Sequence, residues 1–318
     1  MARNKKTSGS LFTFMNFLIA LLLKNGQYRT MQHYKATLNS YMRFRDNKDI
    51  TFKEIDAKEM QSYEAYLKNV AKVCNNTSSF YLRILRATYN KAVEKGYATQ
   101  QNPFKDVYTG IAKTNKRAIP TESVSSIKHL DTAKDFTPKQ ELARDTFLMC
   151  FYLRGISFID LAHLRKSDLK DGFVSYTRSK TGQRISIRWE KDMQDIVDKY
   201  QAQTADSTYL FPFLASDTNS QKGSIQDKRL DELRLYHNAE SRITYHLKKL
   251  GAKMGINGKL TLYVARHSWA TTARDKNISI SIISEALGHN SETTTQIYLH
   301  SIQSSEVDDA NAEILASI

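Results

Sequence analysis

The chain has 318 residues, a length that favours two domains, each able to bury its own core. With 41% hydrophobic and 25% charged residues, the composition is that of a soluble globular protein. An excess of 47 Lys and Arg over 33 Asp and Glu gives a net charge of +14, which favours a polyanionic partner. The two cysteines, Cys74 and Cys150, lie in apolar helical contexts and indicate buried thiols, which excludes a disulfide framework or a cysteine metal site.

The N-terminal segment consists of a basic arm, residues 1–10, and an apolar run, residues 11–23. Secretory signal peptides also place basic residues before an apolar run, but no small-residue cleavage site follows here. This run of 13 residues is also shorter than the roughly 20 that a membrane-spanning helix needs. We therefore expect the first helix of a folded domain, with secretion as the alternative.

Residues 11–95 predict a helical bundle with segments at 11–24, 28–45, 57–73 and 77–95. The second and fourth segments alternate tyrosines with lysines and arginines. Bases contact phosphates, and tyrosine hydroxyls can do the same, so this pattern suits a nucleic-acid surface. The alternative is a bundle whose basic faces are only solvated. The bases favoured for such contacts are Lys35, Arg43, Arg83 and Arg86.

A break at residues 102–103 and a basic stretch at 104–120 separate this bundle from the second half of the chain. A proline-containing capping box at residues 137–140 opens an apolar helix that runs to residue 153. This helix is expected to be the core of a second domain.

Residues 173–189 alternate apolar and polar side chains around Lys180-Thr181-Gly182, which predicts a β-hairpin. Arg178 and Arg184 flank its tip and are further candidates for nucleic-acid contact. A long basic helix is expected at residues 225–250, ended by Gly251 and presenting bases such as Arg242 to a groove, to a phosphate backbone or to solvent.

Residues 260–300 predict three short helices. In the first, Arg266 shares a face with three apolar residues, and a buried guanidinium needs an anionic partner. The second starts near Ser279, buries Ile282, Ile283 and Leu287, and ends at Gly288, so that His289 lies just past a helix end. The third carries Tyr298. The geometry points an arginine, a histidine and a tyrosine at one place.

Three motifs here resemble the tyrosine recombinases, a family of phage integrases, Xer-type resolvases and conjugative-transposon integrases. They are ARHSWAT at 265–271, LGH at 287–289, and Tyr298 nine residues after His289. The resemblance implies a mainly α fold with a small antiparallel β-sheet, an N-terminal helical core-binding (SAM-like) domain and a C-terminal catalytic domain of the DNA breaking-rejoining fold.

The resemblance also implies the site. Tyr298 would attack a DNA phosphodiester to give a 3′-phosphotyrosine and a free 5′-hydroxyl. Arg266 and His289 would bind the phosphate, Lys180 would protonate the departing oxygen, and Asp160 would occupy the position of the family's acidic residue. No metal or cofactor is expected, and the covalent intermediate would make ATP unnecessary.

Two positions depart from the family pattern. Ser157 stands where the family has its first arginine, so Arg154, three residues earlier, is predicted to supply that charge. Ser157 itself is interpreted as a helix cap, with Asp160 three residues later. Tyr263 stands at a histidine position and is expected to support the phosphate, whereas His267 is interpreted as structural. Integrases of Bacteroides-type mobile elements look similar at Ser157.

The implied domains are an arm (1–10), a core-binding domain (11–103), a linker (104–120), a catalytic domain (121–300) and a tail exchanged between protomers (301–318). The implied partner is double-stranded DNA at specific sites, bound by a homotetramer in the cytoplasm and nucleoid, without a membrane, and with DNA-bending or directionality factors as further partners. The expected function is that of a mobile-element integrase. The alternatives are a type IB topoisomerase, a catalytically silent DNA-binding protein of the same fold, and a nonspecific RNA-binding protein.

Overall fold

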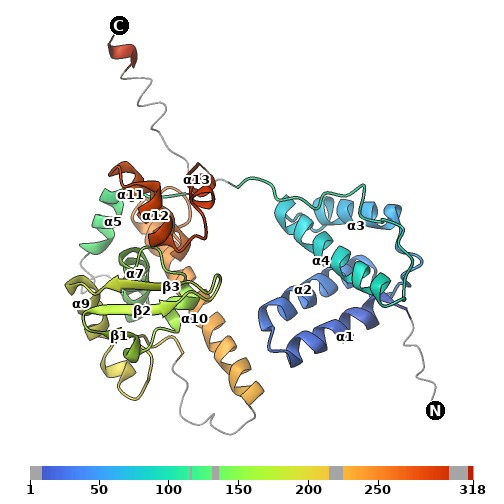
Figure 1. Ribbon diagram of the computed structural model, residues 1–318, viewed down its shortest axis with the longest axis horizontal. Helices are drawn as coiled ribbons and strands as arrows, with labels where there is room; N and C mark the ends of the chain where they lie inside the picture. The colour runs from blue at the N-terminus through green and yellow to red at the C-terminus, as the bar shows by residue number, and fades with distance from the viewer. Residues whose placement is uncertain (1–8, 115–116, 131–135, 215–224, 301–313, 318) are drawn as a thin grey trace. The chain divides into compact units, whose positions relative to one another are not determined.

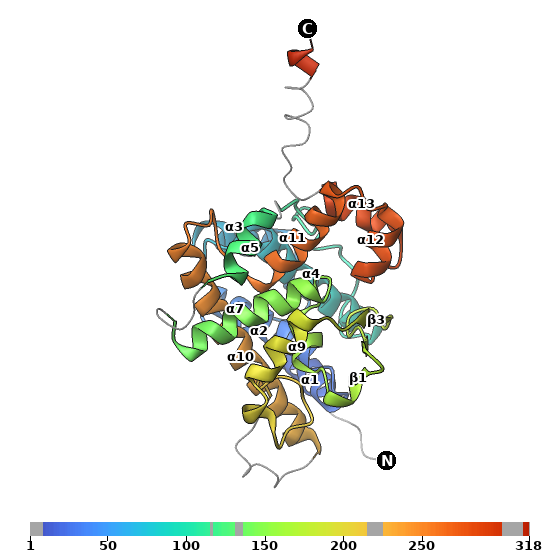
Figure 2. The same cartoon turned by 90° about the vertical axis from the view of Figure 1, so that its left-hand side faces the viewer.

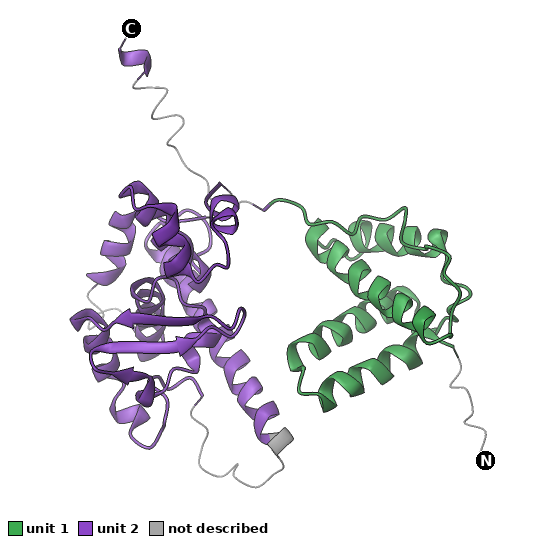
Figure 3. Ribbon diagram, viewed as in Figure 1, with its two compact units in different colours: residues 1–113 green, residues 114–318 purple. Residues whose placement is uncertain are grey.

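The structure, a computed structural model, describes the chain except for residues 1–8, 115–116, 131–135, 215–224, 301–313 and 318 (Figure 1, Figure 2). The chain forms two compact units, Met1–Lys113 and Thr114–Ile318, which Figure 3 shows in different colours. Each unit has its own hydrophobic core. Among the helices that the structure describes, none combines the length and apolar character needed to cross a membrane.

The described residues of the first unit form four helices: α1 (Leu11–Lys24), α2 (Tyr28–Phe44), α3 (Ala57–Asn69) and α4 (Asn75–Glu94). They confirm the predicted bundle. Helix α1 packs against α2, and α4 packs against both α2 and α3 (Figure 1). The apolar run of α1 faces this core through Leu11, Met15 and Leu18.

Tyr34 and Tyr41 of α2 and Tyr89 of α4 lie inside the bundle, whereas Tyr28 and Tyr81 are half-buried. Tyr41 and Tyr89 are fully buried. The hydroxyl of Tyr41 donates to the Glu59 carboxylate at 2.7 Å, and that of Tyr89 donates to the Thr99 carbonyl at 2.7 Å. The interpretation of these tyrosines as phosphate contacts is therefore wrong. The helical period that turns the bases outward turns these rings into the core.

The predicted linker is largely part of the two units. Phe104 and Val107 are buried in the core of the first unit, and Ile119 is buried in the core of the second. The end of the predicted arm is also attached, since the carbonyl of Gly9 accepts from the Phe52 amide at 2.9 Å. Residues 1–8 lie outside the described part.

One of the two cysteines differs from expectation. Cys150 is buried, as predicted, but Cys74 is exposed at the first position of the turn that opens α4. An N-cap residue lies outside the helix in extended backbone, so the apolar residues next to Cys74 in the sequence do not cover its side chain.

In the second unit the described helices and strands are, in chain order, α5 (Thr121–Lys128), α7 (Pro138–Tyr152), α8 (Phe158–Ala162), β1 (Leu169–Lys170), β2 (Phe173–Thr177), β3 (Arg184–Arg188), α9 (Lys191–Lys199), α10 (Ile225–Lys253), α11 (Leu262–Asp275), α12 (Ile280–Leu287) and α13 (Glu292–His300). Helix α7 packs against both α10 and α11, and Figure 2 shows it in the middle of this unit.

The capping box of α7 is confirmed. The Thr137 hydroxyl accepts from the Gln140 amide at 3.4 Å, and the Gln140 side chain accepts from the Thr137 amide at 2.9 Å. Helix α10 continues past Gly251 to Lys253, so the prediction that Gly251 ends it is wrong. A Cβ at Gly251 would meet Cβ of Leu260 at 2.8 Å, so the glycine serves close packing within the helix.

The predicted hairpin is also confirmed. Strands β1, β2 and β3 pair antiparallel in that order, with Val174 opposite Ile187 and Tyr176 opposite Ile185. Val174, Ile185 and Ile187 are buried, so one face of the hairpin covers the core of the unit.

Candidate active site

Residues 260–300 are all described, and they form α11, α12 and α13, as predicted. Ser279 caps α12 by accepting from the Ile282 amide, and Gly288 ends it in the left-handed conformation at φ 63°. Ile283 and Leu287 are fully buried, but Ile282 is 58% exposed, so its predicted burial is wrong. Adjacent helical positions lie about 100° apart, and the narrow core face of this short helix holds only one of the two isoleucines.

Arg266 of α11 is buried, with 4% of its surface exposed. Its Nη1 donates to the Gly155 carbonyl at 2.8 Å, and its Nη2 donates to the Leu287 carbonyl at 2.6 Å. Its Nε is buried and has no hydrogen-bond partner in the described part of the chain. Gly155 lies in a left-handed conformation at φ 74°, where a Cβ would meet Cγ of Arg266 at 2.6 Å. Only a glycine lets the two segments approach this closely.

His289 lies just past the end of α12, beside Arg266 and Tyr298. Its Nε2 is 3.1 Å from Nη2 of Arg266, and its Nδ1 is 2.9 Å from the Thr295 hydroxyl. Because a guanidinium only donates, Nε2 is the acceptor, and the proton of the neutral ring sits on Nδ1. The ring meets that of Tyr298 edge-to-face at 5.5 Å between centroids.

Tyr298 of α13 is buried, with 7% exposed, and its hydroxyl lies 2.7 Å from Nδ1 of His267. The two rings stack at 5.4 Å between centroids. From the sequence His267 was interpreted as structural, and this contact with Tyr298 was not predicted. His267 and Arg266 are neighbours on α11 and point in different directions. Helix α13 is placed so that the Tyr298 ring stacks on the His267 imidazole while its hydroxyl also feels the charge of the Arg266 guanidinium.

The electrostatics of the site hold Tyr298 as a neutral phenol in the free protein. Burial raises the pKa of the Tyr298 hydroxyl well above its ordinary value, and the positive charge of Arg266 opposes that rise. Burial also lowers the pKa of the Arg266 guanidinium, as does the like charge of Arg178. A bound phosphodiester would complement this concentration of positive charge.

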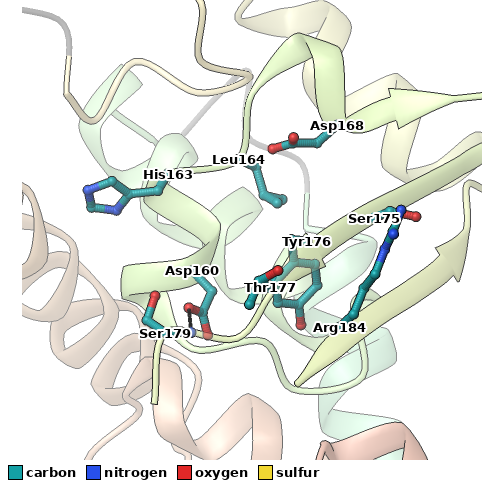
Figure 4. Close-up of a pocket in the computed structure, with 9 residues that line it drawn as sticks. All are labelled: Asp160, His163, Leu164, Asp168, Ser175, Tyr176, Thr177, Ser179 and Arg184. Atoms are coloured by element: carbon teal, nitrogen blue, oxygen red, sulfur yellow. Dashed lines mark hydrogen bonds between the residues drawn. The ribbon is translucent and has the colours of Figure 1, made fainter. Parts of the chain in front are cut away.

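Asp160 links α8 to the hairpin. One carboxylate oxygen accepts from the Ser157 hydroxyl at 2.6 Å, and the other accepts from the Ser179 amide at 2.9 Å, the bond dashed in Figure 4. Ser157 occupies the N-cap position of α8, as predicted, but its hydroxyl bonds Asp160 instead of a helix amide. Asp160, Ser179 and Arg184 also line a pocket of about 290 Å³ (Figure 4).

Arg178 was predicted to flank the hairpin tip and contact nucleic acid, but its side chain points inward. It is 8% exposed, and its Nη1 donates to the Gly288 carbonyl. The reason is strand parity, since Arg178 is two and four residues beyond Tyr176 and Val174, which share the inward face. Arg184 and the hairpin-tip Lys180 are exposed, as expected of nucleic-acid contacts.

The remaining candidates are a half-buried arginine, an exposed tyrosine and five further bases. Arg154 follows the C-cap of α7 in a left-handed conformation at φ 55° and is half-buried. Its guanidinium makes no hydrogen bond or ion pair among the described residues. Tyr263 is 52% exposed, and its ring packs edge-on against His267 at 4.9 Å. Of the other candidate bases, Arg83 is half-buried. The rest are exposed: Lys35, Arg43, Arg86 and Arg242.

An arginine, a histidine and a tyrosine that converge from three consecutive helices, in a unit that follows a separate helical bundle, define this chain as a tyrosine recombinase. The phage integrase SAM-like domain matches residues 10–111, and the phage integrase family matches residues 121–304. The chain belongs to the phage integrase family.

Relatives and solved structures agree with this assignment. The tyrosine recombinase XerC of Leptospira interrogans is 24% identical over 292 residues, which cover 90% of this chain and 86% of that one. The tyrosine recombinase XerA of Pyrococcus furiosus is 29% identical over 191 residues, which cover 59% of this chain and 58% of the length of that relative.

Among solved structures, a lambda integrase dimer bound to a COC′ core site has a TM-score of 0.61 at 17% identity, covering 91% of this chain and 77% of that one. The Tn1549 transposon integrase in complex with transposon right end DNA has a TM-score of 0.61 at 12% identity, covering 96% and 99%. Both comparisons identify the fold.

Proposed function

We propose that this recombinase cuts and rejoins DNA strands through Tyr298. The Tyr298 oxygen attacks the scissile phosphorus, the bond from phosphorus to the 5′-oxygen breaks, and the products are a 3′-phosphotyrosine and a 5′-hydroxyl. Attack of a 5′-hydroxyl on the phosphotyrosine reverses these bond changes and rejoins a strand without ATP. The observation that carries this proposal is the convergence of Tyr298 with Arg266 and His289.

The buried phenol needs a proton acceptor, because burial raises its pKa. We assign this role to Nδ1 of His267, which lies 2.7 Å from the Tyr298 oxygen. Arg266 neutralises charge on a nonbridging phosphate oxygen, and His289 donates there in the tautomer that carries its proton on Nε2 and accepts from the Thr295 hydroxyl at Nδ1. One such preorganised contact is worth about 3 kcal/mol of transition-state stabilisation. Lys180, exposed on the hairpin, gives its proton to the departing 5′-oxygen.

The substrate in this proposal is double-stranded DNA with a specific recombination site, and the task is movement of a mobile element. A transposon integrase bound to transposon end DNA shares this fold, which supports the assignment. A lambda integrase tetramer bound to a Holliday junction also shares it, with a TM-score of 0.61. By analogy we propose a homotetramer that joins two duplexes, assisted by DNA-bending or directionality factors. The predicted exchange of residues 301–318 falls mostly outside the described residues and stays part of this proposal.

The test uses duplexes selected for binding from a random library and rebuilt with a nick beside the cleavage position. Cleavage then releases a short 5′-hydroxyl fragment, and the protein stays joined to the DNA. Wild-type protein should form an adduct that survives denaturing electrophoresis, and Tyr298→Phe should form none while still binding the duplex. Tyr245→Phe is the matched control, because Tyr245 is 53% exposed on α10. Binding without any adduct in the wild type would favour a silent DNA-binding protein.

A further inference from the structure

The position at which the family places its first phosphate-binding arginine holds no positive charge in this chain. Ser157 stands there, and its hydroxyl is bound to Asp160 at 2.6 Å. We propose, on the basis of the recombinase function above, that Arg178 is the second arginine of the site and binds the scissile phosphate beside Arg266. It reaches the site from the end of β2 instead of from α8.

Two adjacent carbonyls hold the two arginines side by side. Nη2 of Arg266 donates to the Leu287 carbonyl, and Nη1 of Arg178 donates to the Gly288 carbonyl. These carbonyls belong to the C-terminal end of α12, where the helix dipole is negative and favours cations. His289 follows directly. The same turn that presents His289 therefore fixes both guanidiniums.

Neither guanidinium is paired with a carboxylate among the residues that the structure describes. Arg178 and Arg266 are 8% and 4% exposed, and in the described part of the chain neither forms an ion pair. Arg144 is a useful contrast, because it is equally buried and pairs with Asp145 at 2.6 Å. Burying a guanidinium without an anion is costly, so two such groups together indicate a site for a bound anion. A phosphodiester fits, since bidentate arginine contacts suit its oxygens.

Arg178 is also close enough to influence the nucleophile. Its positive charge is among those that lower the pKa of the Tyr298 hydroxyl against the effect of burial, and it also acts on Arg266. Arg154, by comparison, makes no side-chain hydrogen bond or ion pair among the described residues, and its backbone is in a left-handed conformation just after the C-cap of α7.

The serine that stands in place of the family's arginine helps to position its substitute. The Ser157 hydroxyl binds one oxygen of Asp160, and the other oxygen of Asp160 accepts from the Ser179 amide. Ser179 follows Arg178 directly. The carboxylate therefore fixes the start of the hairpin tip, and with it the direction in which Arg178 points. In this role Asp160 is a positioning residue.

The test measures single-turnover cleavage of the nicked duplex by Arg178→Met, Arg178→Lys and Arg154→Met. Each is assayed on a normal phosphodiester and on a methylphosphonate at the scissile position, which lacks the negative charge that an arginine would neutralise. We expect Arg178→Met to cleave the phosphodiester about 10²- to 10³-fold more slowly, as when an oxyanion donor is removed. Its loss on the methylphosphonate should be much smaller, and Arg178→Lys should be intermediate.

Two results would overturn the proposal. One is normal cleavage by Arg178→Met while Arg154→Met shows the charge-dependent loss. The other is an equal loss by Arg178→Met on both substrates, which would indicate that Arg178 only supports Gly288. If Arg178→Met does not fold, as judged by its thermal midpoint, the ratio of the two rates for Arg178→Lys decides. Absence of cleavage by wild-type protein would instead refute the recombinase function itself.

Discussion

Replacement of Gly155 by alanine should damage the site through a single contact. A Cβ at this position would lie 2.6 Å from Cγ of Arg266 and 2.8 Å from its Cα. Carbon atoms pack at about 3.5–4.0 Å, so Arg266 has to move by roughly an ångström. Misplacement of a catalytic group by about 1 Å can cost about 10²-fold in rate. Overpacking of about 1–3 kcal/mol adds to about 1–2 kcal/mol for the left-handed alanine, so unfolding should become about 2–5 kcal/mol easier.

Gly172→Ala separates the contact from the backbone strain. Gly172 has the same φ of 74°, but a Cβ there would meet nothing within 4 Å. We expect it to lose only about 1–2 kcal/mol of stability and to cleave at the wild-type rate. The assays are urea unfolding and single-turnover cleavage of the nicked duplex. Equal stabilities and equal cleavage rates for the two variants would refute the reasoning that Gly155 is needed by Arg266.

Three further predictions concern stability and reactivity. Thr137→Ala should lower the free energy of unfolding by about 1 kcal/mol, measured in urea, because it removes the capping box of α7. The bond between His163 and Glu232 raises the pKa of the histidine and lowers that of the glutamate. The stability that the histidine contributes is fully present below pH 6.5 and is lost as pH rises through its raised pKa in the folded protein. The stability that the glutamate contributes is fully present above pH 4.5 and is lost as pH falls through its lowered pKa. His163→Gln should therefore reduce the free energy of unfolding most between pH 4.5 and 6.5, by only a few tenths of a kcal/mol, because both groups are partly exposed. Urea unfolding measures this, and an equal loss in alkaline buffer would contradict it. A thiol reagent should label one cysteine rapidly in the native protein, because Cys74 is exposed with a pKa lowered by its bond to Thr77, whereas burial raises that of Cys150; rapid labelling of both would be inconsistent.

Much of the fold follows from local patterns in the sequence. The capping box at Thr137, the glycine at Gly288 and the alternation around Lys180 place α7, the end of α12 and the hairpin correctly. Such signals depend on a few neighbouring residues. Expectations failed where burial is decided by packing between elements, as for Tyr41 inside the bundle and Ile282 on the surface.

The candidate site shows the same division. Arg266, His289 and Tyr298 could be identified from spacing, because three short helices with clear ends constrain where they point. The contact of His267 with Tyr298 was not predicted, because the sequence around His267 does not determine how α13 packs near α11. Arg178 was predicted only as a candidate for nucleic-acid contact, and its burial was not expected because a basic residue beside a hairpin tip is ordinarily solvated.

The most direct measurement is to digest the trapped adduct with nuclease and trypsin and to locate the nucleotide by mass spectrometry. Lys276 is the last lysine or arginine of the chain, so trypsin releases residues 277–318 as one peptide, and its single tyrosine is Tyr298. We expect the nucleotide on this peptide. A nucleotide on residues 260–266, the tryptic peptide that contains Tyr263, would contradict it.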